Sequence, residues 1–475
     1  MPIEMTQKRL TTEEKALSIN LDPTIYGSFA EIGAGQEVAA TFFRTGGSSG
    51  TIAYTHSAYD MKISDSMYGK CKRYVCEDRL HQMLDKEYQN LHNTIPKRAE
   101  TSRFFAFANT VESLNYHKTN QGQGWVGIKF QLKKHGPPNQ IILHVKMHDN
   151  SHQEQQKTLG ILGVNLIHAA YSDYEKITEF LEDLSYRLPK DRMEIDMCSV
   201  TGPDFEHVDN RLIALLLVKT KLTDATMFDQ TGQVIQATST LYKKNIFLMR
   251  GRFRPATKVH VDMVSAGLDL FLKEPEVDPE QVQVLLELTL KDLTADGKIS
   301  IKDFLDRAEL LTSMGYTVMI SNYLKHYKMI EYLSTFTKGR KMGVVLGVYN
   351  LQTIFDEKYY DNLEGGLLEA FGRGFGRNVK MFVYPALNVE DGSLYDLANF
   401  ELPSHLTGLL DYMKKTNKIE AISDYKYQLM KIFSDDVLAK IKAGASNWEE
   451  DVPEEVMKAI KYYKLFGYKT KKVKV

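Results

Sequence analysis

The chain contains 475 residues, of which 43% are hydrophobic and 25% are charged. This composition is typical of a globular protein of one or more domains, and it excludes a disordered or collagen-like chain. The 60 Lys and Arg residues almost balance the 61 Asp and Glu residues, so we expect no nucleic-acid partner.

No run of about 18 apolar residues occurs, and no apolar segment of a secretory signal follows the first ten residues. We therefore expect no membrane span and a cytoplasmic location. The three cysteines, Cys71, Cys76 and Cys198, include no C-x-x-C pair, which fits a reducing compartment. We expect all three to be free thiols.

Residues 1–120 mix short helical patterns with glycine-rich turns, and we predict that they form a mixed N-terminal segment. One amphipathic helix is predicted over 79–91, because apolar residues recur there at helical spacing. The apolar stripe of this helix consists of Leu80, Leu84, Tyr88 and Leu91.

Residues 121–400 alternate between apolar, strand-like runs and helical patterns. The strand-like runs cover 141–147, 193–198, 246–249, 317–320, 342–348 and 379–384. The helical patterns cover 155–169, 210–217, 259–272, 323–336 and 366–375. Apolar strands separated by helices are typical of parallel strands covered on both faces. We therefore predict an α/β fold, with a mainly parallel sheet, helices on both faces and a Rossmann-like ligand edge.

Two further segments flank this α/β core. The run at 125–132 alternates in polarity, and His135-Gly136-Pro137-Pro138 joins it to the next strand, which predicts an antiparallel hairpin at the edge of the sheet. Residues 401–475 show helical patterns, including 437–441 and 454–465, and predict a C-terminal helical segment.

The exit of the strand at 246–249 is the richest part of the chain in groups that bind anions. In open parallel sheets, ligands bind beyond the carboxyl ends of the strands, where loops and helix N-termini converge. The free N–H groups at the start of the next helix favour an anion, and arginine suits bidentate contacts with phosphate. The predicted nucleotide-binding residues are Arg250, Gly251, Arg252, Phe253 and Arg254.

A resemblance to a known family rests on the same segment. Residues 251–260 are Gly-Arg-Phe-Arg-Pro-Ala-Thr-Lys-Val-His. They resemble the G-x-F-x-P-x-[H/T]-x-G-H signature of the nucleotidylyltransferase superfamily, with Val259 in place of the second glycine. The whole chain is also similar to a group of uncharacterised bacterial proteins of like length that often carry the label nicotinate-nucleotide adenylyltransferase. The resemblance implies that Thr257 and His260 are catalytic, because they would contact the triphosphate and stabilise charge during an in-line attack.

The function implied by the resemblance is transfer of an adenylyl group from ATP, with Mg²⁺, to a mononucleotide. The alternative is a non-catalytic protein with a degenerate site, which senses a phosphate or nucleotide or assembles with itself. Val259 supports the alternative, as does a second family signature, Ser-Ser-Thr-x-x-Arg, that is represented only by a fragment at 337–340. The expected partners are a nucleotide or another phosphorylated small molecule and, because the 26 Tyr and 22 Phe could form an interface, further copies in a homo-oligomer.

Residues 292–303 match the calcium loop of EF-hands. Oxygen-bearing side chains stand at loop positions 1, 3, 5, 9 and 12, and Gly297 stands at position 6. Helical patterns at 281–290 and 303–311 flank the loop, although position 12 carries Asp instead of the usual Glu. The sequence therefore predicts a Ca²⁺ or Mg²⁺ site, with an Asp-Gly turn between two helices as the alternative. The predicted metal residues are Asp292, Thr294, Asp296, Lys298, Ser300 and Asp303.

Overall fold

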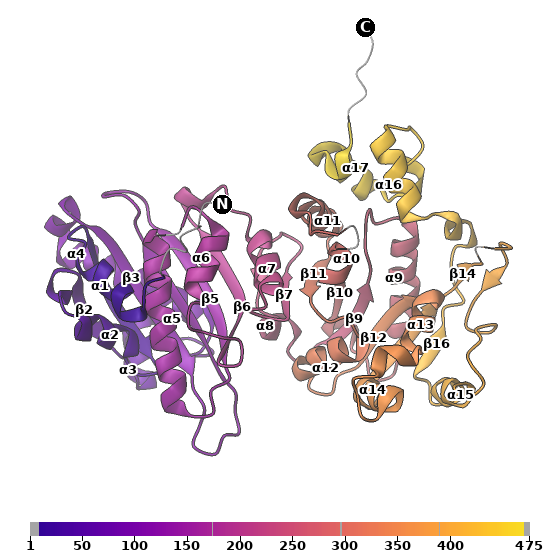
Figure 1. Ribbon diagram of the computed structural model, residues 1–475, viewed down its shortest axis with the longest axis horizontal. Helices are drawn as coiled ribbons and strands as arrows, with labels where there is room; N and C mark the ends of the chain where they lie inside the picture. Colours follow the sequence, from indigo (N-terminus) through magenta and orange to yellow (C-terminus); the bar gives the residue numbers. More distant parts are fainter. Residues whose placement is uncertain (1–8, 173, 295–296, 389, 470–475) are drawn as a thin grey trace, which may run out of the picture. The chain divides into compact units, whose positions relative to one another are not determined.

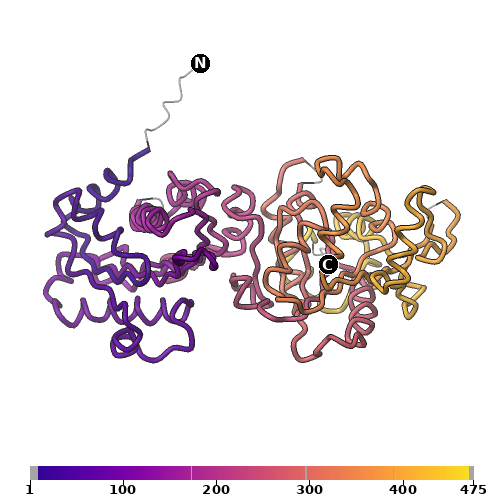
Figure 2. The backbone as a smooth tube through the Cα atoms, turned by 90° about the horizontal axis from the view of Figure 1, so that it is seen from below, coloured from indigo at the N-terminus to yellow at the C-terminus, as the bar shows by residue number. Residues whose placement is uncertain are grey.

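The computed structural model describes residues 9–172, 174–294, 297–388 and 390–469. The chain forms two compact units, residues 1–223 and 224–475. Each unit is one continuous stretch of chain, as the colours of the backbone in Figure 2 show. The boundaries expected at 120/121 and 400/401 both fall inside a unit. Among the helices of the described ranges, none is both long and apolar enough to cross a membrane.

Unit 1 contains a six-stranded mixed sheet (Figure 1). Its strands are β1 (Ile25–Ile32), β2 (Ile52–His56), β3 (Arg103–Glu112), β4 (Gly122–Phe130), β5 (Asn139–Met147) and β6 (Met193–Thr201). Its α-helices are α1 (Thr12–Asn20), α2 (Glu37–Thr45), α3 (Met61–Tyr68), α4 (Glu77–Thr94), α5 (His152–Ser172), α6 (Ile177–Leu184) and α7 (Asn210–Lys219).

The strand order in unit 1 is β2-β1-β3-β4-β5-β6. Strand β1 is parallel to β2 and to β3, whereas β3, β4, β5 and β6 are successively antiparallel. Alternate residues of β3 face opposite sides, as the two-residue period of a strand requires. Phe105 and Phe107 belong to the large core that includes side chains of α1, α2 and α5, while Phe104 packs in a smaller cluster with Tyr88 and Leu91 of α4.

Unit 2 contains an eight-stranded sheet. Its strands are β7 (Ala225–Phe228), β8 (Val234–Ile235), β9 (Asn245–Arg250), β10 (Val282–Thr289), β11 (Thr317–Ser321), β12 (Met342–Gly347), β13 (Val379–Tyr384) and β16 (Ile419–Ala421), and a separate small hairpin pairs β14 (Ala386–Leu387) with β15 (Leu394–Tyr395). Its α-helices are α8 (Ala237–Leu241), α9 (Lys258–Phe271), α10 (Leu290–Leu293), α11 (Ile301–Ser313), α12 (His326–Thr337), α13 (Val348–Ile354), α14 (Gly366–Phe375), α15 (Thr407–Lys415), α16 (Ser434–Ala443) and α17 (Glu454–Tyr463).

The strand order in unit 2 is β16-β13-β12-β9-β10-β11-β7-β8. The six strands from β16 to β11 are parallel, and β7 and β8 add an antiparallel edge. The chain enters these six strands at β9, adds β10 and β11 on one side, and then crosses to β12, β13 and β16 on the other. This is the order of a doubly wound Rossmann-type sheet. The order reverses between β9 and β12, so ligand binding is expected at the carboxyl ends of these two strands.

Helices cover both faces of the unit 2 sheet. On one face, Phe247 of β9 and Phe382 of β13 pack against Phe271 of α9, with ring centroids 5.4 to 6.2 Å apart. On the other face, the neighbouring residues Ile246 and Leu248 belong to a core with side chains of α12, α13 and α14. The apolar run of β9 is therefore buried on both sides, as a central parallel strand should be.

The predicted α/β fold class is confirmed, but several of its details differ from expectation. The strands expected at 141–147 and 193–198 belong to the sheet of unit 1, where they are antiparallel neighbours. The hairpin of β4 and β5 forms as expected, although β4 lies inside its sheet and not at the edge. The helix expected over 281–290 is the strand β10, which lies between β9 and β11.

Candidate functional site

The carboxyl ends of β9 and β12 border a crevice of about 470 Å³. Seven of the residues predicted from the sequence line it: Arg250, Gly251, Arg252, Phe253, Arg254, His260 and, from the predicted metal loop, Asp292. Met249 and Met263 add to this wall, and the rest comes from segments much later in the chain, the turn from β12 into α13 and the start of α16, which include Gly347, Tyr349, Asn350, Phe433 and Asp435. These later residues carry no motif, so only the folded sheet reveals that they belong to the crevice.

Arg250 at the end of β9 is held by its neighbouring strand. Its Nε and Nη2 atoms donate to the two carboxylate oxygens of Glu287 in β10, at 2.8 and 2.9 Å. Glu287 is fully buried and also accepts from the hydroxyl of Ser321 in β11. A buried carboxylate needs such partners to offset its desolvation. Through Glu287, Arg250 therefore connects the ends of three strands, and its guanidinium group is already hydrogen-bonded.

Arg254 is also engaged, by Asp303 in the first turn of α11. Its Nε atom donates to Asp303 Oδ1 at 2.6 Å, and Arg307 donates to the other oxygen of the same carboxylate. Arg307 further donates from Nη1 to the backbone carbonyl of Arg252 at 3.1 Å. Burial lowers the pKa of Arg307 from its ordinary value, and the charge of Asp303 opposes that shift. This cluster fixes the loop that carries Arg252.

Arg252 differs from the two arginines beside it. Its side chain is 41% exposed, and its ion pair is a 3.5 Å contact from Nη1 to Asp435, which is itself 72% exposed. Its Nε atom is buried and has no hydrogen-bond partner among the residues that the structure describes. Arg252 is therefore the cation of this crevice that is most available to a ligand anion.

The predicted catalytic residues Thr257 and His260 lie side by side at the start of α9, where they bond to each other. The backbone N–H of Thr257 donates to Nδ1 of His260 at 3.0 Å, and the Thr257 hydroxyl lies 3.0 Å from the same nitrogen. The Thr257 side chain is buried, and desolvation lowers the pKa of His260 to about 4. At neutral pH the imidazole is therefore uncharged, so it does not supply the positive charge that a triphosphate needs.

The loop at 292–303 joins α10 to α11, and four of its six predicted metal residues, Asp292, Thr294, Ser300 and Asp303, have hydrogen-bond partners within the protein. Asp292 accepts from the Thr289 hydroxyl, Thr294 donates to the carbonyl of Leu290, and Ser300 accepts from the backbone N–H of Asp303 at the N-terminus of α11. Asp296 lies outside the described residues, and Lys298 is exposed. No group of three or more His, Cys, Asp or Glu side chains suited to a metal occurs in the described part of the chain. Cation binding by this loop stays a prediction.

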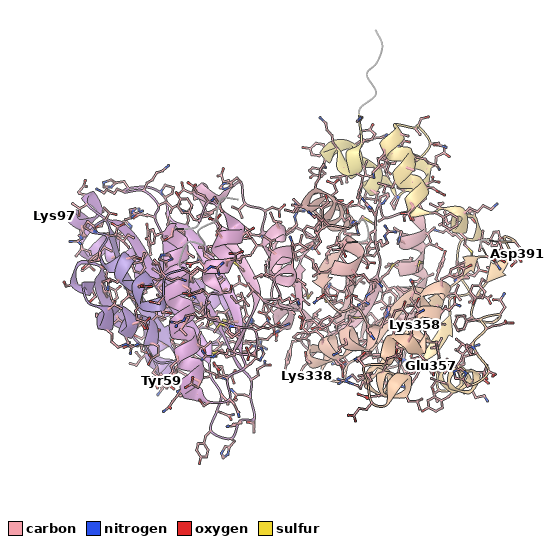
Figure 3. The ribbon with its side chains drawn as sticks, in the orientation of Figure 1. Tyr59, Lys97, Lys338, Glu357, Lys358 and Asp391 are labelled. Carbon is pink, nitrogen blue, oxygen red and sulfur yellow. The ribbon has the colours of Figure 1, made fainter. Side chains whose placement is uncertain are left out.

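The fragment at 337–340 that matches part of the second family signature lies at the opposite edge of the sheet. It follows α12 and precedes β12, so it stands at the amino end of that strand. Lys338, labelled in Figure 3, has a φ of 51° and forms the left-handed end of α12. The fragment is therefore the C-terminal end of a helix, and the length of β12 separates it from the crevice.

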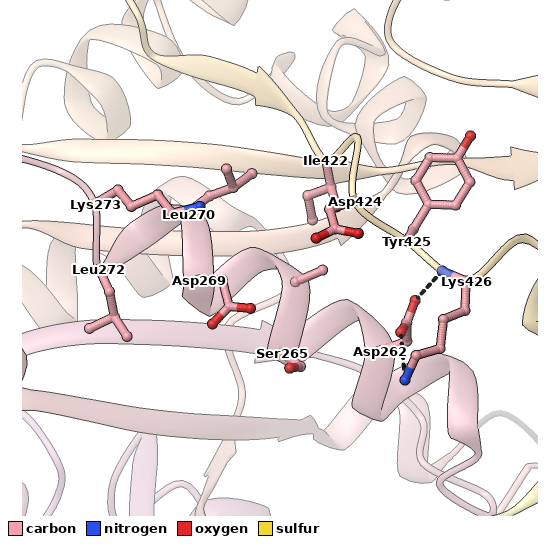
Figure 4. A pocket seen from close by; sticks show the side chains of 11 residues that line it. Asp262, Ser265, Asp269, Leu270, Leu272, Lys273, Ile422, Asp424, Tyr425 and Lys426 are labelled. Carbon is pink, nitrogen blue, oxygen red and sulfur yellow. Dashed lines mark hydrogen bonds and ion pairs between the residues drawn. The ribbon is translucent and has the colours of Figure 1, made fainter.

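A second pocket, of about 410 Å³, lies between α9 and the segment that follows β16 (Figure 4). Its buried carboxylate, Asp262, accepts from the Tyr384 hydroxyl at 2.7 Å and from the backbone N–H of Lys426 at 2.9 Å. Burial raises the pKa of Tyr384, and the bond to Asp262 acts in the same direction. These contacts fasten the chain after β16 onto α9, and they give Asp262 a structural role.

Comparisons with known proteins give no family for this chain. No family model matches it, and no curated protein matches it. Among solved structures, it resembles the competence/damage-inducible protein CihA of Agrobacterium tumefaciens, at 19% identity over 35% of this chain and 98% of that one, with a TM-score of 0.25. It also resembles CinA superfamily proteins of Enterobacter cloacae, at 10% identity over 36% and 98% and a TM-score of 0.25, and of Escherichia coli, at 14% identity over 36% and 98% and a TM-score of 0.23. Similarity this low does not support an inference about function.

The expected relationship to proteins labelled nicotinate-nucleotide adenylyltransferase is wrong, because no family model and no curated protein matches the chain and the solved structures named above are not described as nucleotidylyltransferases. The function derived from the short motif, transfer of an adenylyl group from ATP to a mononucleotide, is wrong for the same reason. The geometry agrees, since Thr257 and His260 bond to each other and Arg254 bonds to Asp303. The expectation of Mg²⁺ with ATP depended on that function and is not carried further.

Proposed function

We propose that unit 2 binds a small phosphorylated molecule in the crevice between the ends of β9 and β12, with Arg252 as the main contact to the phosphate. The observation that carries the proposal is that Arg252, which is partly exposed and weakly paired, lies where the order of the strands reverses. Doubly wound sheets bind ligands at that point, and here the crevice contains a partly exposed arginine between two arginines that form buried ion pairs.

The surroundings of Arg252 explain why the loop can present it. Arg250 and Arg254 anchor the two sides of the loop through Glu287 and Asp303, and Arg307 holds the carbonyl of Arg252 itself. The guanidinium is thus attached to a fixed backbone, which lowers the entropy that a ligand has to remove on binding. An anion that displaces the exposed Asp435 would exchange a loose ion pair for charge-assisted hydrogen bonds.

Calorimetric titration tests this proposal, with inorganic pyrophosphate and ribose 5-phosphate as probes and the full chain as receptor. An Arg252→Ala variant should bind either probe about 10- to 100-fold more weakly, since hydrogen bonds to charged groups contribute about 1.5–3 kcal/mol. The matched control is Arg340→Ala, because Arg340 is exposed at the amino edge of the same sheet. Equal affinities for the two variants, or no binding of either probe to the wild-type protein, would contradict the proposal.

Self-association stays a prediction. Large aromatic side chains do reach the surface in both units, for example Tyr59 at 74% exposure, labelled in Figure 3, and Tyr462 at 80%. Most Phe side chains of the described residues are buried in the two cores, so the aromatic content of the sequence is mainly internal. Light scattering on the full chain tests self-association, and a strict monomer at micromolar concentration would contradict the prediction.

A further inference from the structure

The loop between α3 and α4 brings two cysteines together. The Sγ atoms of Cys71 and Cys76 lie 3.5 Å apart, and both side chains are partly exposed. Two sulfurs at this separation are in van der Waals contact, and rotation about the side-chain bonds can bring them to the 2.05 Å of a disulfide. The third cysteine, Cys198, is fully buried, and burial raises its pKa to about 12.

The loop that carries the pair is attached to the body of unit 1. The carbonyl of Tyr74, midway between the two cysteines, accepts from the Thr110 hydroxyl of β3 at 2.6 Å. The Tyr74 hydroxyl donates to Asp65 of α3 at 3.1 Å, and Arg79 of α4 donates to the same carboxylate at 3.1 Å. Because α3, α4 and β3 all hold this loop, the fold keeps the backbones of the two cysteines close together.

The surroundings of Cys76 favour an uncharged disulfide over a thiolate. Burial raises the pKa of the Cys76 thiol to about 11, against a backbone hydrogen bond from Arg79 that lowers it. Desolvation penalises a thiolate but does not penalise a disulfide, which carries no charge. Lys70 and Lys72 flank Cys71 and are exposed, so the site attracts anionic oxidants such as glutathione disulfide.

We propose that Cys71 and Cys76 form a reversible intramolecular disulfide with a low-molecular-weight disulfide such as glutathione disulfide as the oxidant. Cys71, as its thiolate, attacks one sulfur of the oxidant and displaces one glutathione thiolate, which gives a mixed disulfide. Cys76 then loses its proton, attacks the sulfur of Cys71 and displaces the second glutathione thiolate. The two cysteines lose two electrons and two protons, and the oxidant becomes two molecules of glutathione. Reversible disulfides of this kind are typical of redox-responsive proteins in reducing compartments.

Intact-mass and peptide analysis of the full chain after equilibration with glutathione buffers tests this site. We expect one bond, seen in a non-reduced tryptic digest as Cys71-Lys72 linked to the peptide 74–79, and a fully reduced Cys198. Cys71→Ser and Cys76→Ser should each abolish the bond, while Cys198→Ser should retain it. Alkylation of both Cys71 and Cys76 after exposure to the oxidant, or glutathione that remains attached to either, would overturn the proposal.

The equilibrium constant for oxidation shows whether the fold favours the Cys71–Cys76 disulfide or whether any short loop with two cysteines would form it equally well. We expect this constant to be at least about tenfold larger in the native protein than in the same chain unfolded in guanidinium, because the native loop raises the effective concentration of one sulfur at the other. A ratio of one or below would show that the fold does not favour the bond, and it would overturn the proposal.

Discussion

Replacement of Asp303 by Ala tests the arginine cluster that supports the crevice. Asp303 accepts hydrogen bonds from both Arg254 and Arg307, and these side chains are only 15% and 2% exposed. Removal of one member of a buried ion pair costs about 3–5 kcal/mol, because the remaining charge stays desolvated. Arg254 can reach water when its partner is lost, so we expect a loss of about 3 kcal/mol in the free energy of unfolding of unit 2.

Tryptophan fluorescence during urea unfolding measures this loss in the unit that contains the change. The chain has two tryptophans, and Trp448 is fully buried in unit 2 whereas Trp125 lies in unit 1, so a Trp125→Phe background reports on unit 2 alone. Lys302→Ala is the matched control. Lys302 precedes Asp303 and pairs with Asp306 from a 68% exposed position, and we expect it to cost less than about 0.5 kcal/mol. If Asp303→Ala cost no more than this control, the cluster would not stabilise the loop.

Two further predictions concern unit 1, and Trp125 fluorescence during urea unfolding measures both. Gly33 has a φ of 91°, and a Cβ atom there would lie 1.9 Å from the backbone oxygen of Val111, so Gly33→Ala should cost at least about 2 kcal/mol. The control Gly46→Ala has a similar φ of 81° but open space around it, and a comparable cost would refute the steric argument. Burial raises the pKa of Glu31 from 4.5 to about 7, so its contribution to stability is present below pH 4.5 and is lost as the pH rises through 7. Glu31→Gln should therefore reduce the fall in stability between pH 5 and pH 8, by up to about 3 kcal/mol, and an unchanged pH profile would refute the shift.

The strand β9 and its exit could be predicted because several local signals agree there. The run at 246–249 is apolar on both faces, a glycine follows it, and a proline precedes the next helix. Apolar runs also predict β11, β12 and β13, and these strands form within one residue of the expected bounds. Position along the chain, however, does not assign strands to sheets, and the two-sheet arrangement depends on contacts between residues that are distant in sequence.

The strand β10 could not be predicted with the same rules. Short apolar runs fit a buried helix as well as a buried strand, and Leu285, Leu286 and Leu288 fit both. The charged Glu287 in this run favours a surface helix when only the sequence is considered. In the structure, Glu287 is fully buried because Arg250 from the neighbouring strand matches its charge. A tertiary ion pair therefore allows a charged residue to lie in a buried strand.

The short motif at 251–260 shows why residue types at a given spacing do not establish chemistry. Each polar side chain of a loop has a limited number of hydrogen bonds, and protein partners and a ligand compete for them. His260 uses Nδ1 for the N–H of Thr257, and Arg254 uses its guanidinium for Asp303. Arg252 is the motif arginine whose pairing is weak and exposed, and it lies at the reversal of strand order. What a ligand can contact in this crevice is thus determined by Glu287, Asp303 and Asp435, which lie outside the motif.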